Sequence, residues 1–278
     1  MRIVSAPRLV LLLGLLALLP ACSLFHTKQT LPETETLPVG QLYQKAHQYL
    51  EDGNYEKAQK YYKRLTARFP FGPWSEQAQL DLAYAEYKGD KLDDAYSSVN
   101  RFIKTYPAQR HIDYAYYLRG LINFNRSTGL LDRWFGREDA DRDPSYNQQS
   151  FNDFAQLVQR YPDSRYSADA RQRMIYLRNL LAQHELNVAM YYLRRQACVG
   201  AANRGKYIIE HYQSSPQTGD ALAIMAKCYA ELGQEKLSAD ARKVLKANYP
   251  DHPYLSDPED WPNFPSNLRR LIPFSRHG

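Results

Sequence analysis

The chain has 278 residues, of which 44% are hydrophobic and 24% are charged. This composition supports a buried core in one large domain or two small ones, and it excludes a disordered chain, a collagen-like fibre and a disulfide-dependent mini-protein. The 36 basic and 30 acidic residues give a formal charge of +6 and are interspersed along the chain. We therefore expect no nucleic-acid partner.

The N-terminus has the pattern of a bacterial export signal. Arg2 and Arg8 form a short basic region, and residues 9–19 are almost entirely apolar. This apolar run is too short to span a bilayer comfortably, but it is typical of a signal-peptide core. Residues 19–22 read Leu-Pro-Ala-Cys and resemble a lipobox. We predict a lipoprotein signal peptide over residues 1–21.

Cys22 is the predicted lipidation site, carrying S-diacylglycerol and N-palmitoyl groups; we expect no other cofactor. Two or more acyl chains anchor a protein stably to a bilayer. Ser23 follows, and the absence of Asp at this position favours the outer membrane, with the chain on its periplasmic face. The alternative is an ordinary cleaved signal followed by a chance Cys. Residues 22–38 contain Thr, Glu and Pro without periodicity, and are predicted to be a lipidated tether.

The rest of the chain repeats itself. Aromatic residues alternate with small ones, a second small residue follows the first after 12 positions, and a Pro ends several units. Small residues let two antiparallel helices approach closely, so this pattern resembles the tetratricopeptide (TPR) signature. It predicts an all-α fold, a right-handed superhelix of five TPR-like helix pairs. The first small residue of each pair recurs mostly at 37-residue intervals, at Ala46, Ala83, Gly120, Ala189 and Ala226.

Two extra segments interrupt the 37-residue period. The insertion at 127–146 is predicted to join the two helices of repeat three, and the helical pattern over 166–186 lengthens the first helix of repeat four. Repeats one to three are predicted over 39–162, and repeats four and five over 163–250. Residues 251–278 are Pro-rich without a helical period, and are predicted to be a C-terminal tail of open role.

The lipobox, the five helix pairs and two further segments together resemble one family. Residues 134–144 contain Trp-Phe-Gly and Asp-Arg-Asp-Pro, and residues 184–192 contain His-Glu-Leu and Tyr-Tyr. Over about residues 20–255 the chain resembles the BamD (ComL) family of outer-membrane lipoproteins. The resemblance implies a non-enzymatic scaffold of the β-barrel assembly machinery. Its implied partners are a BamA POTRA domain, the lipoproteins BamC and BamE, and the C-terminal targeting signal of unfolded outer-membrane proteins.

In a TPR superhelix the first helix of each pair lines the concave face. Three positions of each repeat place aromatic and apolar side chains there, with cations beside them. Such a surface suits an extended peptide that ends in an aromatic residue and a carboxylate. The alternative is that about half of these residues form interhelix core. The predicted substrate-peptide groove consists of Tyr43, His47, Tyr84, Tyr87, Lys88, Tyr117, Leu121, Phe124 and Arg126.

The resemblance also makes Arg204, in the second helix of repeat four, the candidate for an ion pair with BamA. A guanidinium can bind a carboxylate through two parallel hydrogen bonds, which Lys cannot. The alternative is a solvated surface Arg. Cys198 and Cys228 remain after lipidation, and could pair in the oxidising periplasm if the fold brings them together.

No catalytic constellation and no metal-ligand spacing is evident, so we expect neither an enzyme nor a metal site. Two rival functions fit the sequence less well. A TPR pilotin-type lipoprotein for a secretin usually lacks the long fourth-repeat helix and the insertion. A periplasmic enzyme acting on peptidoglycan would need paired carboxylates or a nucleophile with its base.

Overall fold

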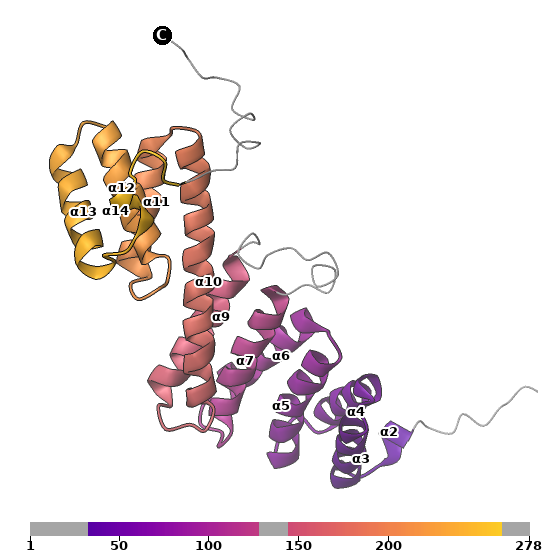
Figure 1. The fold of residues 1–278 in the computed structure, drawn as a ribbon. Helices are drawn as coiled ribbons and strands as arrows, with labels where there is room; N and C mark the ends of the chain where they lie inside the picture. The colour runs from indigo at the N-terminus through magenta and orange to yellow at the C-terminus, as the bar shows by residue number, and fades with distance from the viewer. Residues whose placement is uncertain (1–32, 128–143, 263–278) are drawn as a thin grey trace, which may run out of the picture.

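The computed structural model describes residues 33–127 and 144–262, and these ranges contain helices and no β-strand. The helices follow one another as antiparallel pairs in an elongated stack (Figure 1). The five pairs are α3 (Val39–Glu51) with α4 (Tyr55–Arg68), α5 (Pro73–Lys88) with α6 (Leu92–Thr105), α7 (Ile112–Ser127) with α9 (Ser145–Arg160), α10 (Ser167–Arg194) with α11 (Cys198–His211), and α12 (Thr218–Glu231) with α13 (Glu235–Asn248). The prediction of an all-α fold of TPR-like helix pairs is confirmed, while the handedness of the superhelix stays a prediction.

The small residues of the first column are all buried where helices contact each other. Gly120 shows why size matters at this position. A β-carbon built on it would lie 2.5 Å from Cε1 of Phe154, whose ring is fully buried and has no room to move. Protein interiors are close-packed, so only Gly fits here without displacing α9 from α7.

Ser occupies the second small column in two of the pairs. The Ser150 hydroxyl donates a hydrogen bond to the Gly120 carbonyl at 2.9 Å, and the Ser238 hydroxyl donates to the Ala226 carbonyl at 2.7 Å. Each bond joins the second helix of a pair to the first at its closest approach. Ser150 was not among the residues predicted from the sequence, although it lies 12 positions before Pro162, as Ala58, Ala95 and Ser238 lie 12 positions before a Pro.

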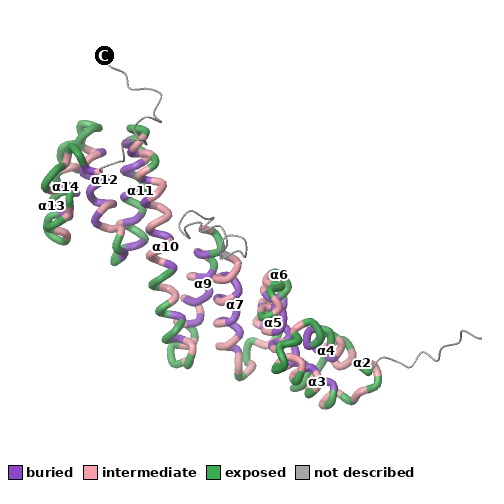
Figure 2. Tube along the Cα trace, turned by 45° about the vertical axis from the view of Figure 1, so that its right-hand side comes forward, coloured by how far each residue is buried: buried purple, intermediate pink, exposed green. Residues whose placement is uncertain are grey.

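The long helix α10 connects the two halves of the molecule. Its 28 residues extend about 42 Å at 1.5 Å per residue. Leu177 belongs to the core shared with α7 and α9, whereas Leu181 and the residues after it belong to the core shared with α11 and α12. Buried residues line the inside of each pair along the whole stack, and exposed residues cover its outer surfaces (Figure 2).

The tether predicted over residues 22–38 extends too far toward the C-terminus, because its last six residues pack against the helices. Residues 33–38 include the short helix α2 (Glu33–Thr36), which packs on α4. The Thr34 side chain is buried, and Arg68 donates hydrogen bonds to the carbonyls of Thr34 at 2.7 Å and Leu37 at 3.0 Å. A segment without helical period can still dock when one Arg satisfies its carbonyl groups, and that contact is invisible to periodicity.

The predicted tail 251–278 likewise begins with an ordered segment. It contains the short helix α14 (Pro253–Ser256), and Tyr254 and Trp261 are buried against the last core. The Lys227 ammonium of α12 donates to the carbonyls of Pro258 at 2.8 Å and Trp261 at 2.9 Å. Residues 251–262 therefore pack on the last helix pair and cover the end of the superhelix.

Several predictions concern residues outside the described ranges. These are the signal peptide, the lipidation of Cys22, most of the insertion at 127–146, and the tail after residue 262. The described part of the insertion shows that α7 ends at Ser127 and that α9 begins at Ser145.

Candidate functional site

The first helices present a row of aromatic side chains along one face of the stack. First helices of successive pairs contact each other directly, α3 with α5, α5 with α7, and α10 with α12, which is the arrangement of the inner face of a TPR superhelix. Ring-to-ring contacts then connect side chains from different repeats. We call this surface the aromatic row. It consists of Tyr43, His47, Trp74, Tyr84, Tyr87, Tyr114, Tyr117, Phe124, Tyr166 and Tyr176.

The first part of the row is built around Tyr43. Its ring stacks on His47 with centroids 5.8 Å apart and contacts Trp74 of the next pair at 5.0 Å. Its hydroxyl donates a 2.6 Å hydrogen bond to Asp81. Burial raises the pKa of the Asp81 carboxyl, although the hydrogen bond from Tyr43 opposes the shift. These contacts fix the orientation of rings that come from two repeats.

The middle of the row passes from α5 through α7 to the start of α10. Tyr84 lies 6.4 Å from Tyr114, Tyr114 lies 5.3 Å from Tyr166, and Tyr117 stacks on Tyr166 at 4.9 Å. The Tyr87 ring lies 6.5 Å from that of Tyr84. These rings are half-buried and pack on the second core, which is formed by α5, α6, α7, α9 and the first half of α10. Each ring thus packs on its own core and also leaves part of its surface open to a ligand.

The last part of the row carries charge. The Tyr117 hydroxyl and the Arg173 guanidinium donate to Asp169 at 2.7 and 2.6 Å. Burial and the bond to Asp169 raise the pKa of Tyr117 to about 12. Burial opposes ionisation of Asp169, but the two donors outweigh it and hold the pKa of this carboxyl below its usual value. Arg173 lies 5.3 Å from the ring of Phe124, which contacts Tyr176 at 5.9 Å.

The structure places eight of the nine predicted groove residues on the first-helix face, with Lys88 exposed at the end of α5 and Leu121 half-buried on the second core. Arg126 is the exception. It lies nine residues after Tyr117, about two and a half turns along α7, and so on the opposite side of the helix. It forms an ion pair with Asp93 and lies 4.4 Å from the ring of Tyr96, both on the second helix α6. The prediction that Arg126 lies beside the groove is wrong.

Several members of the row were not predicted from the sequence. Helical spacing could have identified Tyr114, which lies three residues before Tyr117. It could also have identified Arg173, the cation beside the row, which lies four residues after Asp169. Trp74 and Tyr166 stand at helix starts, where the column count did not reach. Arg173 supplies the cation beside the row that Arg126 was expected to supply.

Arg204 lies on the second helix of the fourth pair, with 44% of its side chain exposed. Its guanidinium donates to Glu185 of α10 at 2.8 Å. The pair is thus formed within the chain, at the surface, and Arg204 keeps further N–H donors for another carboxylate. It lies in the half of the molecule that does not carry the aromatic row.

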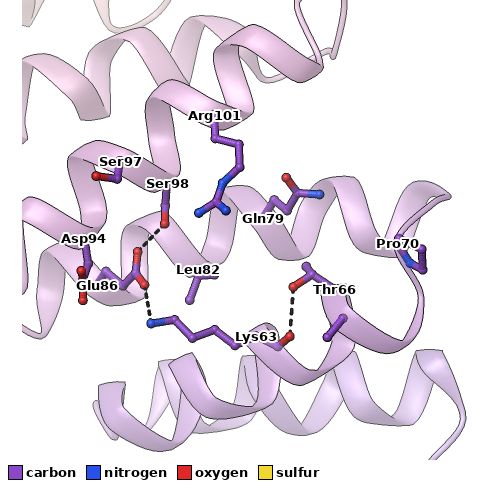
Figure 3. Close-up of a pocket in the computed structure, with 11 residues that line it drawn as sticks. Lys63, Thr66, Pro70, Gln79, Leu82, Glu86, Asp94, Ser97, Ser98 and Arg101 are labelled. Carbon is purple, nitrogen blue, oxygen red and sulfur yellow. Dashed lines mark hydrogen bonds and ion pairs between the residues drawn. The ribbon is translucent and has the colours of Figure 1, made fainter.

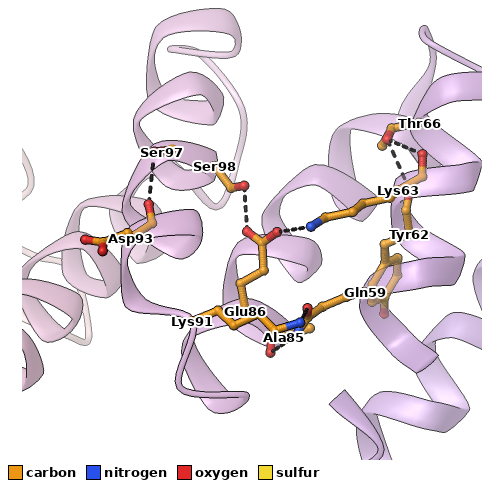
Figure 4. Close-up of polar contacts among 10 residues, drawn as sticks. All are labelled: Gln59, Tyr62, Lys63, Thr66, Ala85, Glu86, Lys91, Asp93, Ser97 and Ser98. Carbon is orange, nitrogen blue, oxygen red and sulfur yellow. Dashed lines mark hydrogen bonds and ion pairs between the residues drawn. The ribbon is translucent and has the colours of Figure 1, made fainter. Parts of the chain in front are cut away.

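A cavity of about 470 Å³ opens between α4, α5 and α6 (Figure 3). At its wall Glu86 is only 1% exposed, and it accepts from Lys63 at 2.9 Å and from the Ser98 hydroxyl at 2.6 Å (Figure 4). Arg101 reaches into the same space from α6. The lining mixes both charges, and its central ion pair joins the second helix of repeat one to repeat two. We assign this cavity a structural role.

Within residues 33–127 and 144–262, no three His, Cys, Asp or Glu side chains gather as metal ligands would. None of the helices in these two ranges combines the length and the apolar character needed to cross a bilayer.

A family model described as "YfiO: Outer membrane lipoprotein" matches residues 35–257. Three similar proteins each carry the name outer membrane protein assembly factor BamD. That of Xylella fastidiosa (strain Temecula1) is 45% identical and covers 96% of this chain and 90% of its own length. Those of Neisseria meningitidis serogroup A and Vibrio cholerae are 41% and 34% identical, covering 82% and 84% of this chain and 87% and 96% of their own lengths. The chain therefore belongs to the BamD (YfiO) family of outer membrane lipoproteins.

Proposed function

We propose that this chain is a non-enzymatic assembly factor for outer-membrane proteins, anchored to the periplasmic face of the outer membrane through lipids on Cys22. The names of its relatives support the role in assembly. Most of the matched region consists of helix pairs, an architecture that other proteins use to bind extended partners. The proposed partners are a BamA POTRA domain, BamC, BamE and unfolded outer-membrane proteins.

The aromatic row is the proposed receptor for the C-terminal targeting signal of an unfolded outer-membrane protein. The single observation that carries this proposal is the chain of ring contacts from α5 through α7 to α10, which ends beside Arg173. A peptide ending in Phe would place its ring among these rings and its carboxylate near a cation. The half-buried rings lose little freedom on binding, which favours affinity.

The double variant Trp74→Ala/Tyr176→Ala tests this assignment. Both side chains are largely exposed, at 44% and 47%, so their removal leaves the core intact. We expect the Kd for a fluorescent β-strand peptide ending in Phe to rise about tenfold or more, since aromatic side chains that become buried on binding dominate such interfaces. Fluorescence anisotropy measures it. Tyr146→Ala, an exposed aromatic on the second helix α9, is the control and should bind as the parent does. Equal Kd values for the parent, the double variant and the control would show that the aromatic row does not bind the peptide.

Arg204 is the proposed contact with BamA, through an acidic side chain of a POTRA domain. Arg204→Glu should reduce co-purification of BamA at least tenfold. The new carboxylate would lie beside that of Glu185, and both would repel the acidic side chain of the POTRA domain. Quantitative immunoblotting of detergent extracts measures this. Glu185→Gln removes the internal partner but keeps the cation, and should retain BamA. Unchanged recovery with Arg204→Glu at moderate salt would contradict the assignment, and recovery of a secretin instead of BamA would favour the pilotin reading.

A further inference from the structure

Two cysteines lie together in the last core of the molecule. Cys198 is the first residue of α11 and Cys228 lies near the end of α12, and their side chains are 5% and 0% exposed. The Cys198 thiol donates to the Glu231 carboxylate at 2.8 Å, and Glu231 lies three residues after Cys228 on the same side of α12. The two thiols are neighbours in one core, each affecting the pKa of the other, and both are free.

We propose that Cys198 and Cys228 are a disulfide site, which covalently joins the fourth helix pair to the fifth. The proposal rests on the proposed periplasmic location for its oxidant, since disulfides form in oxidising compartments. Disulfide geometry requires side chains that face each other at short range. The contact of Cys198 with Glu231, about one turn from Cys228 on α12, places both cysteines in the same part of the interface between α11 and α12.

The chemistry is two thiol–disulfide exchanges. One cysteine thiolate attacks a disulfide oxidant, forming a mixed disulfide and releasing one reduced thiol of the oxidant. The second cysteine thiolate then attacks the protein sulfur of the mixed disulfide, forming the Cys198–Cys228 bond and releasing the second thiol. In total the protein loses two protons and two electrons, and the oxidant is reduced to two thiols.

The surroundings of the thiols set the time of oxidation. Burial, and for Cys198 the hydrogen bond to Glu231, raise the pKa of both thiols above their ordinary value. The thiolate is the attacking form, and an oxidant cannot reach side chains that are this buried. Oxidation therefore takes place while the chain folds, before α11 and α12 close on each other.

The bond would stabilise a core to which α11 and α12 contribute several small side chains. Four of them are Ala201, Ala202, Ala221 and Ala223, each of which buries little apolar surface. A disulfide that closes a loop of about 30 residues restricts the unfolded chain, so we expect the melting temperature of the oxidised protein to exceed that of the reduced protein by roughly 5–10 °C.

Oxidative refolding of the mature chain tests the proposal. The variant Cys22→Ala leaves only these two cysteines. The protein is unfolded and reduced, refolded with glutathione disulfide, then denatured and treated with a thiol-alkylating reagent, and its intact mass is measured. We expect no added label, and two labels after reduction. Cys228→Ser is the control and should show one label or one glutathione adduct. Folded, reduced protein should resist the same oxidant for hours.

Two labels, or two glutathione adducts, after oxidative refolding would overturn the proposal and leave the periplasmic location untouched. The same alkylation is then applied to protein extracted from its own cells. If refolding forms the bond but the extracted protein carries two free thiols, the disulfide does not form in the cell and the proposal fails, while the location is decided separately by fractionation. Absence of label in both preparations supports the proposal.

Discussion

Replacing Asp153 by Ala is expected to lower the free energy of unfolding by about 3–5 kcal/mol, because the change leaves a buried cation without its counter-ion. Asp153 of α9 forms an ion pair with Arg119 at 2.7 Å and accepts a hydrogen bond from Asn123 at 2.7 Å, both on α7. The Arg119 side chain is only 12% exposed, so water cannot replace the lost carboxylate. Urea denaturation followed by circular dichroism measures the change.

The matched control is Asp163→Ala, which removes an exposed carboxylate and should change stability by less than about 0.5 kcal/mol. The double variant Arg119→Met/Asp153→Leu should recover most of the loss. Burial raises the pKa of Asp153 in spite of the nearby guanidinium, which shows that the ionised carboxylate carries a desolvation cost. Apolar replacement of both partners removes that cost. A loss below 1 kcal/mol for Asp153→Ala would show that the pair does not hold α7 to α9.

Replacing Cys22 by Ala is expected to release the mature protein from the outer membrane almost completely. Each buried methylene of an acyl chain contributes about 0.8 kcal/mol to membrane binding, so the loss of two or three chains removes the anchor. Fractionation of cells that lack BamA measures the effect without retention by that partner. Ser23→Ala, which keeps the acylated Cys, is the control and should stay with the membrane. A Cys22→Ala protein that remains with the outer membrane in these cells would contradict the lipid anchor.

Repeat three connects the buried core to the aromatic row. Phe154 packs against Gly120 and lies 5.9 Å from the ring of Tyr117, so the contact that closes the third pair also positions the middle of the aromatic row. Tyr117 in turn stacks on Tyr166 at the start of α10. The row is therefore a property of the stacked repeats, and no single repeat contains it.

The arrangement of repeats could be predicted from the sequence because it depends on local patterns. A small residue mostly at 37-residue intervals, with Pro at several repeat ends and two extra segments between Gly120 and Ala189, is enough to place the helix pairs, since each pair needs a small residue at its closest approach. The same count indicated that the first helix of repeat four is long, and α10 has 28 residues. Side chains near the counted positions, such as Tyr84 and Tyr117, could also be assigned to the first-helix face.

Other features depended on contacts between residues far apart in the chain, which no local pattern records. The Arg126 side chain contacts α6 because it lies on the side of α7 opposite to Tyr117. Residues 33–38 and 251–262 are ordered because Arg68 and Lys227 satisfy their carbonyl groups, and neither segment has a period. The neighbouring thiols of Cys198 and Cys228 result from the packing of α11 on α12. Local patterns therefore place the ten paired helices, whereas the side chains that meet across pairs, and the short helices α2 and α14, follow from tertiary packing, because burial and directed hydrogen bonds select those contacts.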